Sequence, residues 1–388
     1  MKKVIFLSVC IIGVSLLFSS CQKDDSMGNS DTKPVSYDAA YVVNGESNSI
    51  SVINLETNKV EKTIDLANLE SMGNGMMNMN MDNMWPHHIY LSPDKSKLAI
   101  AAPGMDFSSG HNMMADTATT NTADSHSSHH GGSTSVNTST SMQMQGKILI
   151  LDAVSGKLLK ELTLDGMTHN AVFSPDGKEL WAALMMPEGK VKVYDANTYT
   201  LLNSITVGQM PAEVTFSDDG KKAFVANGMS NSVTVIDAIT KQVIDTITTG
   251  EEPVGAWPGM DGMMYVDNEE GESISIINSM TNMMTDTIHL GFMPGMASRN
   301  SMMNQMWVSD PENSKIHFWT KSDTGLVHGG AVNVGSGAHA IAFTKDGKTC
   351  YVTNQNEGTV SVVDVSAKSE ILKISVGVKP NGLVIRYK

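Results

Sequence analysis

Residues 211–250 read PAEVTFSDDGKKAFVANGMSNSVTVIDAITKQVIDTITTG. An apolar segment precedes the turn Ser217–Gly220, and a second apolar segment and a polar bend follow. The stretch ends in two segments that alternate apolar and polar residues. Period-two alternation bounded by Gly, Asp and Asn is typical of β-strands joined by hairpins. These forty residues therefore predict one unit of four antiparallel strands.

The same unit recurs along the chain. An aromatic residue returns in the second strand at steps of 43, 41, 42 and 44 residues, at Trp181, Phe224, Tyr265, Trp307 and Tyr351. A repeat of about 40–45 residues with four strands is the period of a β-propeller. We therefore predict an all-β fold of seven four-stranded antiparallel blades, with units at 41–69, 86–164, 169–208, 211–250, 253–291, 294–335 and 338–377.

The two ends of this region complement each other. The first unit begins at Tyr41 with a second strand and lacks an innermost one. Residues 380–385, PNGLVI, have the pattern of an innermost strand without a unit of its own. Pairing of the two would close the ring and remove an open sheet edge. We therefore predict a propeller over residues 39–388, closed by its C-terminal strand.

These units resemble those of the YVTN-repeat family of seven-bladed β-propellers. Tyr351-Val352-Thr353-Asn354 carries the signature itself, and variants occur at 41–44, 224–227 and 265–268. The resemblance covers about residues 41–388 apart from two insertions, and it implies the fold. It implies little about function, because a propeller is a scaffold on which unrelated sites are built.

The N-terminus predicts export. Residues 1–21 read MKKVIFLSVCIIGVSLLFSSC, with two Lys before an apolar run that is shorter than a membrane span. The ending LFSSC resembles the lipobox of bacterial lipoproteins, which implies a signal peptide at 1–20, lipidation of Cys21 and a polar tether at 21–38. Gln22–Asp25 resembles the acidic tag of Bacteroidetes surface lipoproteins, so we expect an outer-membrane location, facing the periplasm or the medium. The alternative is a plain secretory signal whose cleavage removes Cys21.

Composition limits the possible partners. The net charge of −14 argues against nucleic-acid binding, because an acidic protein does not attract a phosphate backbone. Cys350 is the one cysteine outside the N-terminal segment, so the propeller has no internal disulfide, and we expect a buried thiol. The 29 Met exceed the 22 Phe, Tyr and Trp together, which is unusual.

Two insertions interrupt the repeat. The first, 70–84, links units one and two, and the second, 103–146, extends the bend after the second strand of unit two. In a meandering blade, both positions lie on the same face of the disc, so we expect the insertions side by side. The second is rich in Ser and Thr, and we expect it to be disordered.

Both insertions carry soft or imidazole ligands. The candidates are Met76, Met77, Met79, Met81 and Met84 in the first, and His111, Met113, Met114, His129 and His130 in the second. Thioethers favour Cu(I), and imidazoles bind Cu(II) and Zn. Adaptable hydrophobic contact, sacrificial oxidation and plain disorder are the alternatives.

Three histidines occupy one position of the repeat. His87, His169 and His339 each stand four residues before an apolar residue of an innermost strand, and His88 follows His87. This position lies at the channel mouth, which is the end of the propeller axis where the innermost strands begin. Converging imidazoles there predict a copper site, with zinc as the alternative. Repeat ancestry, with each imidazole hydrogen-bonded to a neighbouring turn, is the competing explanation.

An adjacent pair such as His87-His88 is similar to one in the propeller of nitrous oxide reductase. This chain shows fewer histidines at the mouth and no electron-transfer domain, so multi-electron reduction is not expected. Phosphate loops, nucleophile elbows, His-Glu-X-X-His and haem motifs are also absent from the sequence.

We therefore predict an exported, lipid-anchored, monomeric propeller that captures, buffers or delivers copper without turnover, with a metal-donor or metal-acceptor protein as partner. The alternatives are an interaction module for a protein, glycan or other surface ligand, and a lactonase-like or oxidoreductase-like enzyme.

Overall fold

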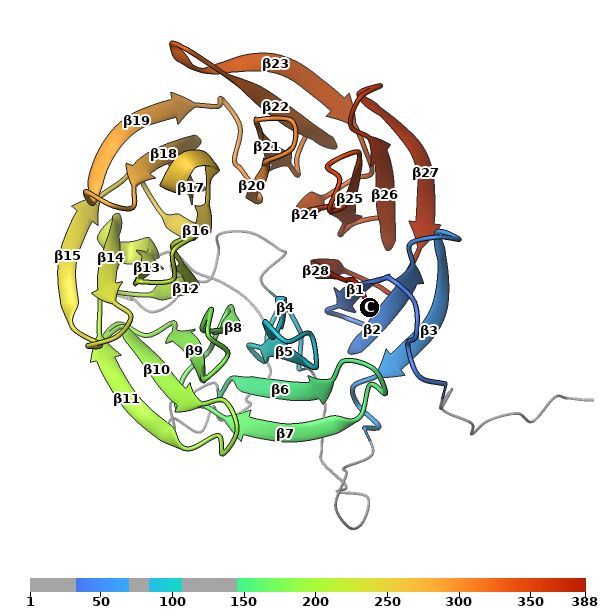
Figure 1. The fold of residues 1–388 in the computed structure, drawn as a ribbon, viewed down its shortest axis with the longest axis horizontal. Coiled ribbons are helices and arrows are strands. Elements are labelled where there is room, and N and C mark those ends of the chain that lie inside the picture. The colour runs from blue at the N-terminus through green and yellow to red at the C-terminus, as the bar shows by residue number, and fades with distance from the viewer. Residues whose placement is uncertain (1–32, 70–83, 107–144) are drawn as a thin grey trace, which may run out of the picture. The chain divides into compact units, whose positions relative to one another are not determined.

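The computed structural model describes residues 33–69, 84–106 and 145–388, and Lys33–Lys388 form one compact unit. Seven four-stranded antiparallel sheets surround a common axis (Figure 1). The only helical segments among the described residues are two single 3-10 turns, Gly228–Ser230 and Met260–Gly262. The predicted all-β propeller of seven blades is therefore confirmed. None of the helices in the described ranges is long and apolar enough to cross a membrane.

The blades follow one another along the chain, each from the innermost strand outwards. Their strands are β28 (Pro380–Arg386), β1 (Ala39–Asn44), β2 (Ser49–Asn54) and β3 (Lys59–Asp65) in blade one; β4 (Ile89–Leu91), β5 (Lys97–Ala102), β6 (Lys147–Asp152) and β7 (Leu158–Thr163) in blade two; β8 (Ala171–Phe173), β9 (Glu179–Leu184), β10 (Lys190–Asp195) and β11 (Leu201–Thr206) in blade three; β12 (Pro211–Phe216), β13 (Lys222–Asn227), β14 (Ser232–Asp237) and β15 (Val243–Thr248) in blade four; β16 (Pro253–Pro258), β17 (Met263–Asn268), β18 (Ser273–Asn278) and β19 (Met283–His289) in blade five; β20 (Ala297–Asn300), β21 (Gln305–Asp310), β22 (Lys315–Ser322) and β23 (Gly325–Asn333) in blade six; and β24 (Ala338–Phe343), β25 (Thr349–Asn354), β26 (Thr359–Asp364) and β27 (Ser369–Ser375) in blade seven.

The C-terminal strand closes the ring as predicted. β28 pairs antiparallel with β1, with Tyr41 opposite Val384. Blade seven is joined to blade one by a side-chain bond as well, because the Tyr351 hydroxyl donates to Asn58 Oδ1 at 2.7 Å. The closure gives β1 a hydrogen-bonded neighbour on both sides, which removes an edge that could pair with another chain.

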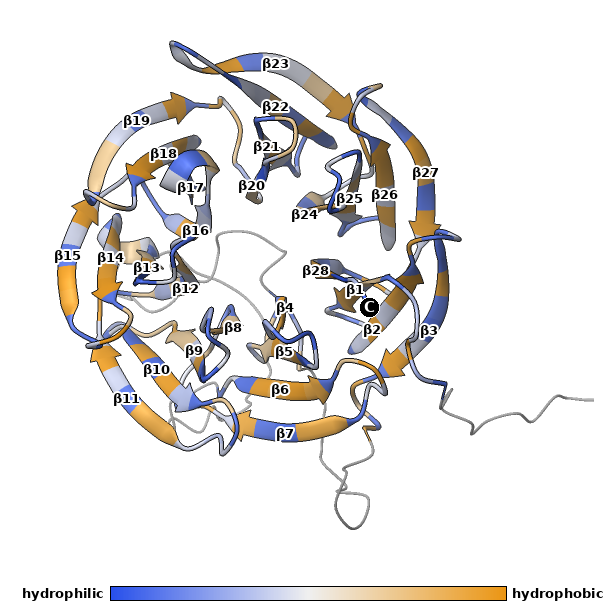
Figure 2. Cartoon of the chain, viewed as in Figure 1, coloured by the Kyte–Doolittle hydropathy of each residue, from blue (hydrophilic) through white to orange (hydrophobic). Residues whose placement is uncertain are grey.

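The core lies between neighbouring blades. The repeating aromatic residues of the second strands are at most 2% exposed, and apolar residues fill the middle strands while the bends are polar (Figure 2). Burying one such ring contributes up to about 3 kcal/mol relative to an exposed position. Blade two has Ala99 at the equivalent place, and it too is fully buried. Cys350 is buried in the apolar cluster of blades six and seven, as expected, and burial raises the pKa of its thiol.

The asparagine that ends the YVTN-like strands has a structural role. Asn354 Nδ2 donates to Thr359 Oγ1 at 2.9 Å and to Ser361 Oγ at 2.8 Å, while its Oδ1 accepts from Gly335 N at 3.1 Å. One buried amide thus ties the third strand of its blade to the end of the previous blade. A Cβ at position 335 would collide with this amide, which explains the glycine. Asn44, Asn227 and Asn268 make the same bonds to their third strands.

Candidate metal centre

The four predicted histidines converge at the channel mouth. His87 and His88 precede β4, His169 precedes β8, and His339 is the second residue of β24. The His87 ring centroid lies 4.7 Å from that of His88, 4.1 Å from that of His169 and 5.5 Å from that of His339. The three strands that they precede or begin, β4, β8 and β24, adjoin the axis in Figure 1. Three separate blades therefore contribute imidazoles to one cluster, and their role as metal ligands stays a prediction.

Three of these side chains already have nearly the spacing of a coordination shell. One ligand nitrogen from each of His87, His88 and His169 lies within 4.8 Å of the other two, and all three residues are buried. Ligand nitrogens about 2.0–2.1 Å from a tetrahedral ion lie about 3.3–3.4 Å apart. Side-chain rotations that bring the nitrogens closer by up to about 1.5 Å would therefore be enough to complete a three-imidazole site.

A buried carboxylate links two of the imidazoles. Glu213, in β12, is fully buried, and its Oε1 lies 2.9 Å from His88 Nε2 and 2.9 Å from His169 Nδ1. The Tyr90 hydroxyl donates to Glu213 Oε2 at 3.5 Å. If each imidazole donates its N–H to this carboxylate, Nδ1 of His88 and Nε2 of His169 keep their lone pairs for a ligand. Carboxylates that orient metal-binding imidazoles in this way are common beside metal sites.

Burial disfavours the charged form of three of the four imidazoles beside Glu213. Burial lowers the pKa of His87, with a further contribution from the neighbouring imidazoles, and burial lowers that of His339 to about 3. Burial also lowers the pKa of His169, although Glu213 opposes this shift. For Glu213, burial acts to raise the pKa, but His88 and His169 outweigh it and lower the pKa to about 2. A metal binds the neutral form of imidazole, so His87, His169 and His339 would release few protons on binding an ion near pH 7.

His339 has a further feature that points to a ligand. Its Nδ1 is buried, and no hydrogen bond reaches it from the described residues. Leaving a buried polar nitrogen without a partner costs about 1–3 kcal/mol. A metal ion or an ordered water at the cluster would remove this cost.

Aromatic and acidic side chains line the mouth beside the histidines. The Trp257 ring centroid lies 6.0 Å from that of His88, and the indole Nε1 donates to Asp267 Oδ1. Gly255 N donates to the other oxygen of Asp267 at 3.1 Å. Burial raises the pKa of Asp267, and the charge of Glu213 raises it further. Sequence reasoning gave no role to Glu213 and did not single out Tyr90, Trp257 or Asp267, because no repeated position marks them.

Met84 is the predicted thioether that the structure describes, and it packs in a hydrophobic core. It is 4% exposed and belongs to the apolar cluster of blades one and two. Its carbonyl accepts a hydrogen bond from Gly104 N at 2.9 Å. The residue that ends the first insertion is thus bonded to one at the start of the second, and it stands three residues before His87.

The remaining predicted ligands lie outside the described residues. They are Met76, Met77, Met79, Met81, His111, Met113, Met114, His129 and His130. Cys21 and the signal peptide lie outside them as well.

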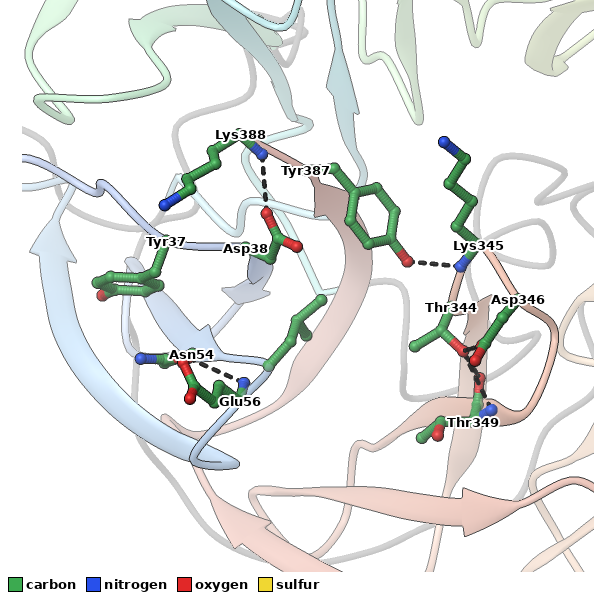
Figure 3. Close-up of a pocket in the computed structure, with 11 residues that line it drawn as sticks. Tyr37, Asp38, Asn54, Glu56, Thr344, Lys345, Asp346, Thr349, Tyr387 and Lys388 are labelled. Atoms are coloured by element: carbon green, nitrogen blue, oxygen red, sulfur yellow. Dashed lines mark hydrogen bonds between the residues drawn. The ribbon is translucent and has the colours of Figure 1, made fainter.

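A pocket of about 470 Å³ lies between blades one and seven, away from the histidines (Figure 3). It adjoins Thr344, which follows the end of β24, whereas His339 stands at the start of that strand. Its polar groups bond to one another: Tyr387 Oη accepts from Lys345 N at 2.6 Å, and Lys388 N donates to Asp38 at 2.9 Å. No imidazole or thiol is among the residues that line this pocket.

Comparison with known proteins supports the fold alone. No family model matches the chain, and no curated protein matches it. A functionally unknown protein from Desulfotomaculum acetoxidans superposes with a TM-score of 0.65 at 12% identity, covering 90% of this chain and 99% of that one. The periplasmic gluconolactonase PpgL of Pseudomonas aeruginosa gives 0.63 at 16% identity, with 90% and 98% covered. Hydrazine synthase of Kuenenia stuttgartiensis gives 0.59 at 16% identity, with 81% and 99% covered.

Proposed function

We propose that this protein binds a soft or borderline transition metal at its channel mouth, copper in the first place and zinc as the alternative. Four imidazoles that meet beside the buried carboxylate of Glu213 carry the proposal. The protein would capture, buffer or deliver the ion without turnover.

The ligand set favours copper or zinc over harder ions. Imidazole nitrogen suits Cu and Zn, whereas Mg and Ca prefer an all-oxygen shell. His87, His88 and His169 would form the core of the site, with His339 as a further ligand and Glu213 holding two of the rings. The Met-rich insertions 70–84 and 103–146 would supply thioethers that collect Cu(I) beside this more rigid site.

We further propose that the chain is a lipid-anchored member of the YVTN-repeat propellers, held in the cell envelope through Cys21. The lipobox-like LFSSC and the recurring asparagine of the second strands support this proposal. An ion entering the envelope would meet the protein there and pass to a partner that removes it.

Copper titration of the purified protein tests the function. We expect about one equivalent to bind tightly at the channel mouth, and the double variant His87→Ala/His169→Ala to lose it. His289→Ala is the matched control, because His289 is an exposed imidazole in β19. Circular dichroism would show that each variant is folded. Wild-type protein that binds no copper or zinc, or a folded double variant that binds as tightly as wild type, would refute the proposal.

A further inference from the structure

A second pair of imidazoles lies on blade six, away from the channel mouth. His317 is in the third strand, β22, and His328 is in the outermost strand, β23. The two strands run side by side at the outer part of the blade (Figure 1). They are eight and nine residues long, whereas the third and fourth strands of the other blades have six or seven. A register shift between Phe318 and Trp319 interrupts their pairing next to His317.

His317 is held in place from two sides. Its Nε2 lies 3.2 Å from Asp310 Oδ2, and the Asp310 side chain is only 2% exposed. The Phe292 ring stacks on the imidazole, with centroids 4.5 Å apart and an interplanar angle of 24°. A buried carboxylate at Nε2 places the ring proton there, so Nδ1 presents its lone pair on the other side.

The free side of His317 faces His328. His317 Nδ1 and His328 Nε2 are 3.4 Å apart, and the His328 ring packs against Trp319 with centroids 5.0 Å apart. Two nitrogens bound to one tetrahedral ion lie about 3.3–3.4 Å apart when each metal bond is about 2.0–2.1 Å long. The same distance is longer than most hydrogen bonds from an N–H donor, which measure about 2.9–3.0 Å to an oxygen acceptor.

We propose that His317 and His328 form a second metal site on the outer part of blade six, which binds Cu(II) or Zn(II) through His317 Nδ1 and His328 Nε2. Asp310 orients His317 and completes a carboxylate–imidazole–metal arrangement. Water or a ligand from a partner fills the remaining positions, because His328 is exposed.

A site with two protein ligands and open positions suits exchange rather than storage. The ion stays accessible to water and to a second molecule, whereas the channel-mouth histidines are buried. This inference does not rest on the channel-mouth centre, since no residue is shared between the two.

Site-resolved histidine modification tests the proposal on the full protein. Diethyl pyrocarbonate modifies accessible imidazoles, and mass spectrometry of peptides reports each histidine separately. We expect Zn²⁺ or Cu²⁺ to protect His328 and to leave the exposed His289 unprotected. In His317→Gln, the metal concentration that half-protects His328 should rise by at least about 10- to 100-fold. Loss of an outer partner alone lowers metal affinity by about that factor, and His317 is a direct ligand in the proposal.

Asp310→Asn separates a metal site from a hydrogen-bonded pair of imidazoles. It removes the charge that orients His317, so the metal concentration that half-protects His328 should rise, while modification without metal changes little. Equal modification of His328 with and without either metal would overturn the proposal. Protection that persists unchanged in folded His317→Gln would overturn it as well. Neither outcome depends on whether copper binds at the channel mouth.

Discussion

Replacing Glu213 by Gln removes the buried charge at the channel mouth while keeping the size of the side chain and one of its oxygens. The carboxylate contacts His88 Nε2 and His169 Nδ1 at 2.9 Å each. Hydrogen bonds to a charged group contribute about 1.5–3 kcal/mol each, and neutral ones about 0.5–1.5 kcal/mol. Replacing two charged hydrogen bonds by neutral ones should therefore lower the free energy of unfolding of the metal-free protein by about 2–3 kcal/mol. The lowered pKa of Glu213, about 2, also indicates that the charged carboxylate stabilises the fold. Burial raises this pKa, but the contacts with His88 and His169 lower it by more.

The same substitution should weaken metal binding. An amide can still accept from one imidazole, but it no longer fixes the orientation of both rings and adds no negative charge beside the ion. Loss of such an outer partner lowers metal affinity by about 10- to 100-fold. Copper affinity would be measured by titration against a competing chelator, and stability by urea unfolding followed by circular dichroism. The two measurements distinguish a weaker site from a weaker fold.

Asp267→Asn is the matched control for Glu213→Gln. Asp267 is equally buried, but it accepts hydrogen bonds from Trp257 and Gly255 rather than from an imidazole. Burial already shifts this carboxyl towards its neutral form, so an amide changes its charge less. We expect Asp267→Asn to leave copper affinity close to that of wild type. If folded Glu213→Gln bound copper as tightly as wild type, or if Asp267→Asn weakened binding as much, the assigned role of Glu213 would be wrong.

Three further outcomes are expected. Phe224→Ala should lower the free energy of unfolding by about 3–5 kcal/mol, measured by urea denaturation, because the ring is fully buried between blades. Deleting 380–388 should leave β1 without its inner partner and make the chain sensitive to limited proteolysis, whereas deleting 387–388 keeps the ladder intact and should not. Burial lowers the pKa of His339 from 6.5 to about 3, so the unfolded chain takes up a proton below pH 6.5 while the folded chain does not. The metal-free protein should therefore lose stability as the pH falls from about 6.5 to about 3, and His339→Gln should flatten that profile in urea titrations at several pH values.

The fold was predictable because each blade repeats the same sequence pattern of strands and turns. Tyr351 and its equivalents return at a nearly constant step, and the polar bends leave little choice of strand boundaries. Ring closure was predictable for the same reason, since the first unit lacked one strand and 380–385 supplied it. Ala99 shows the limit of the pattern: the position is as buried as its aromatic equivalents, but its residue type does not reveal this.

The candidate site was only partly predictable. Repeat alignment brought His87, His169 and His339 together, because equivalent positions meet around the axis. Contacts between positions that are not equivalent have no such signal. The packing of Trp257 near His88 depends on the actual distance across the mouth. The pairing of His317 with His328 likewise depends on a register shift in the strand ladder.

Met84 shows a different limit of reasoning from composition. The sequence groups it with the Met-rich insertion, whereas the structure places it in the apolar cluster of blades one and two. A thioether is both a soft ligand and a flexible apolar side chain, so composition cannot separate the two roles at the end of a loop. Met84 is buried and packs in that cluster, and its role as a ligand stays a prediction.

Duplication of the blade, which would copy a histidine to the same position of several blades, explains only part of the histidine cluster. It accounts for an imidazole at the shared position of blades two, three and seven, although Ala212 occupies that position in blade four. It does not account for His88, which stands one residue further on, or for Glu213, which bonds both His88 and His169. A buried charge costs several kcal/mol unless partners compensate it, and the lowered pKa values show that burial also disfavours the charged imidazoles. Packing alone would be served better by apolar residues at these places, which supports the proposal that the nitrogens of this cluster bind a ligand.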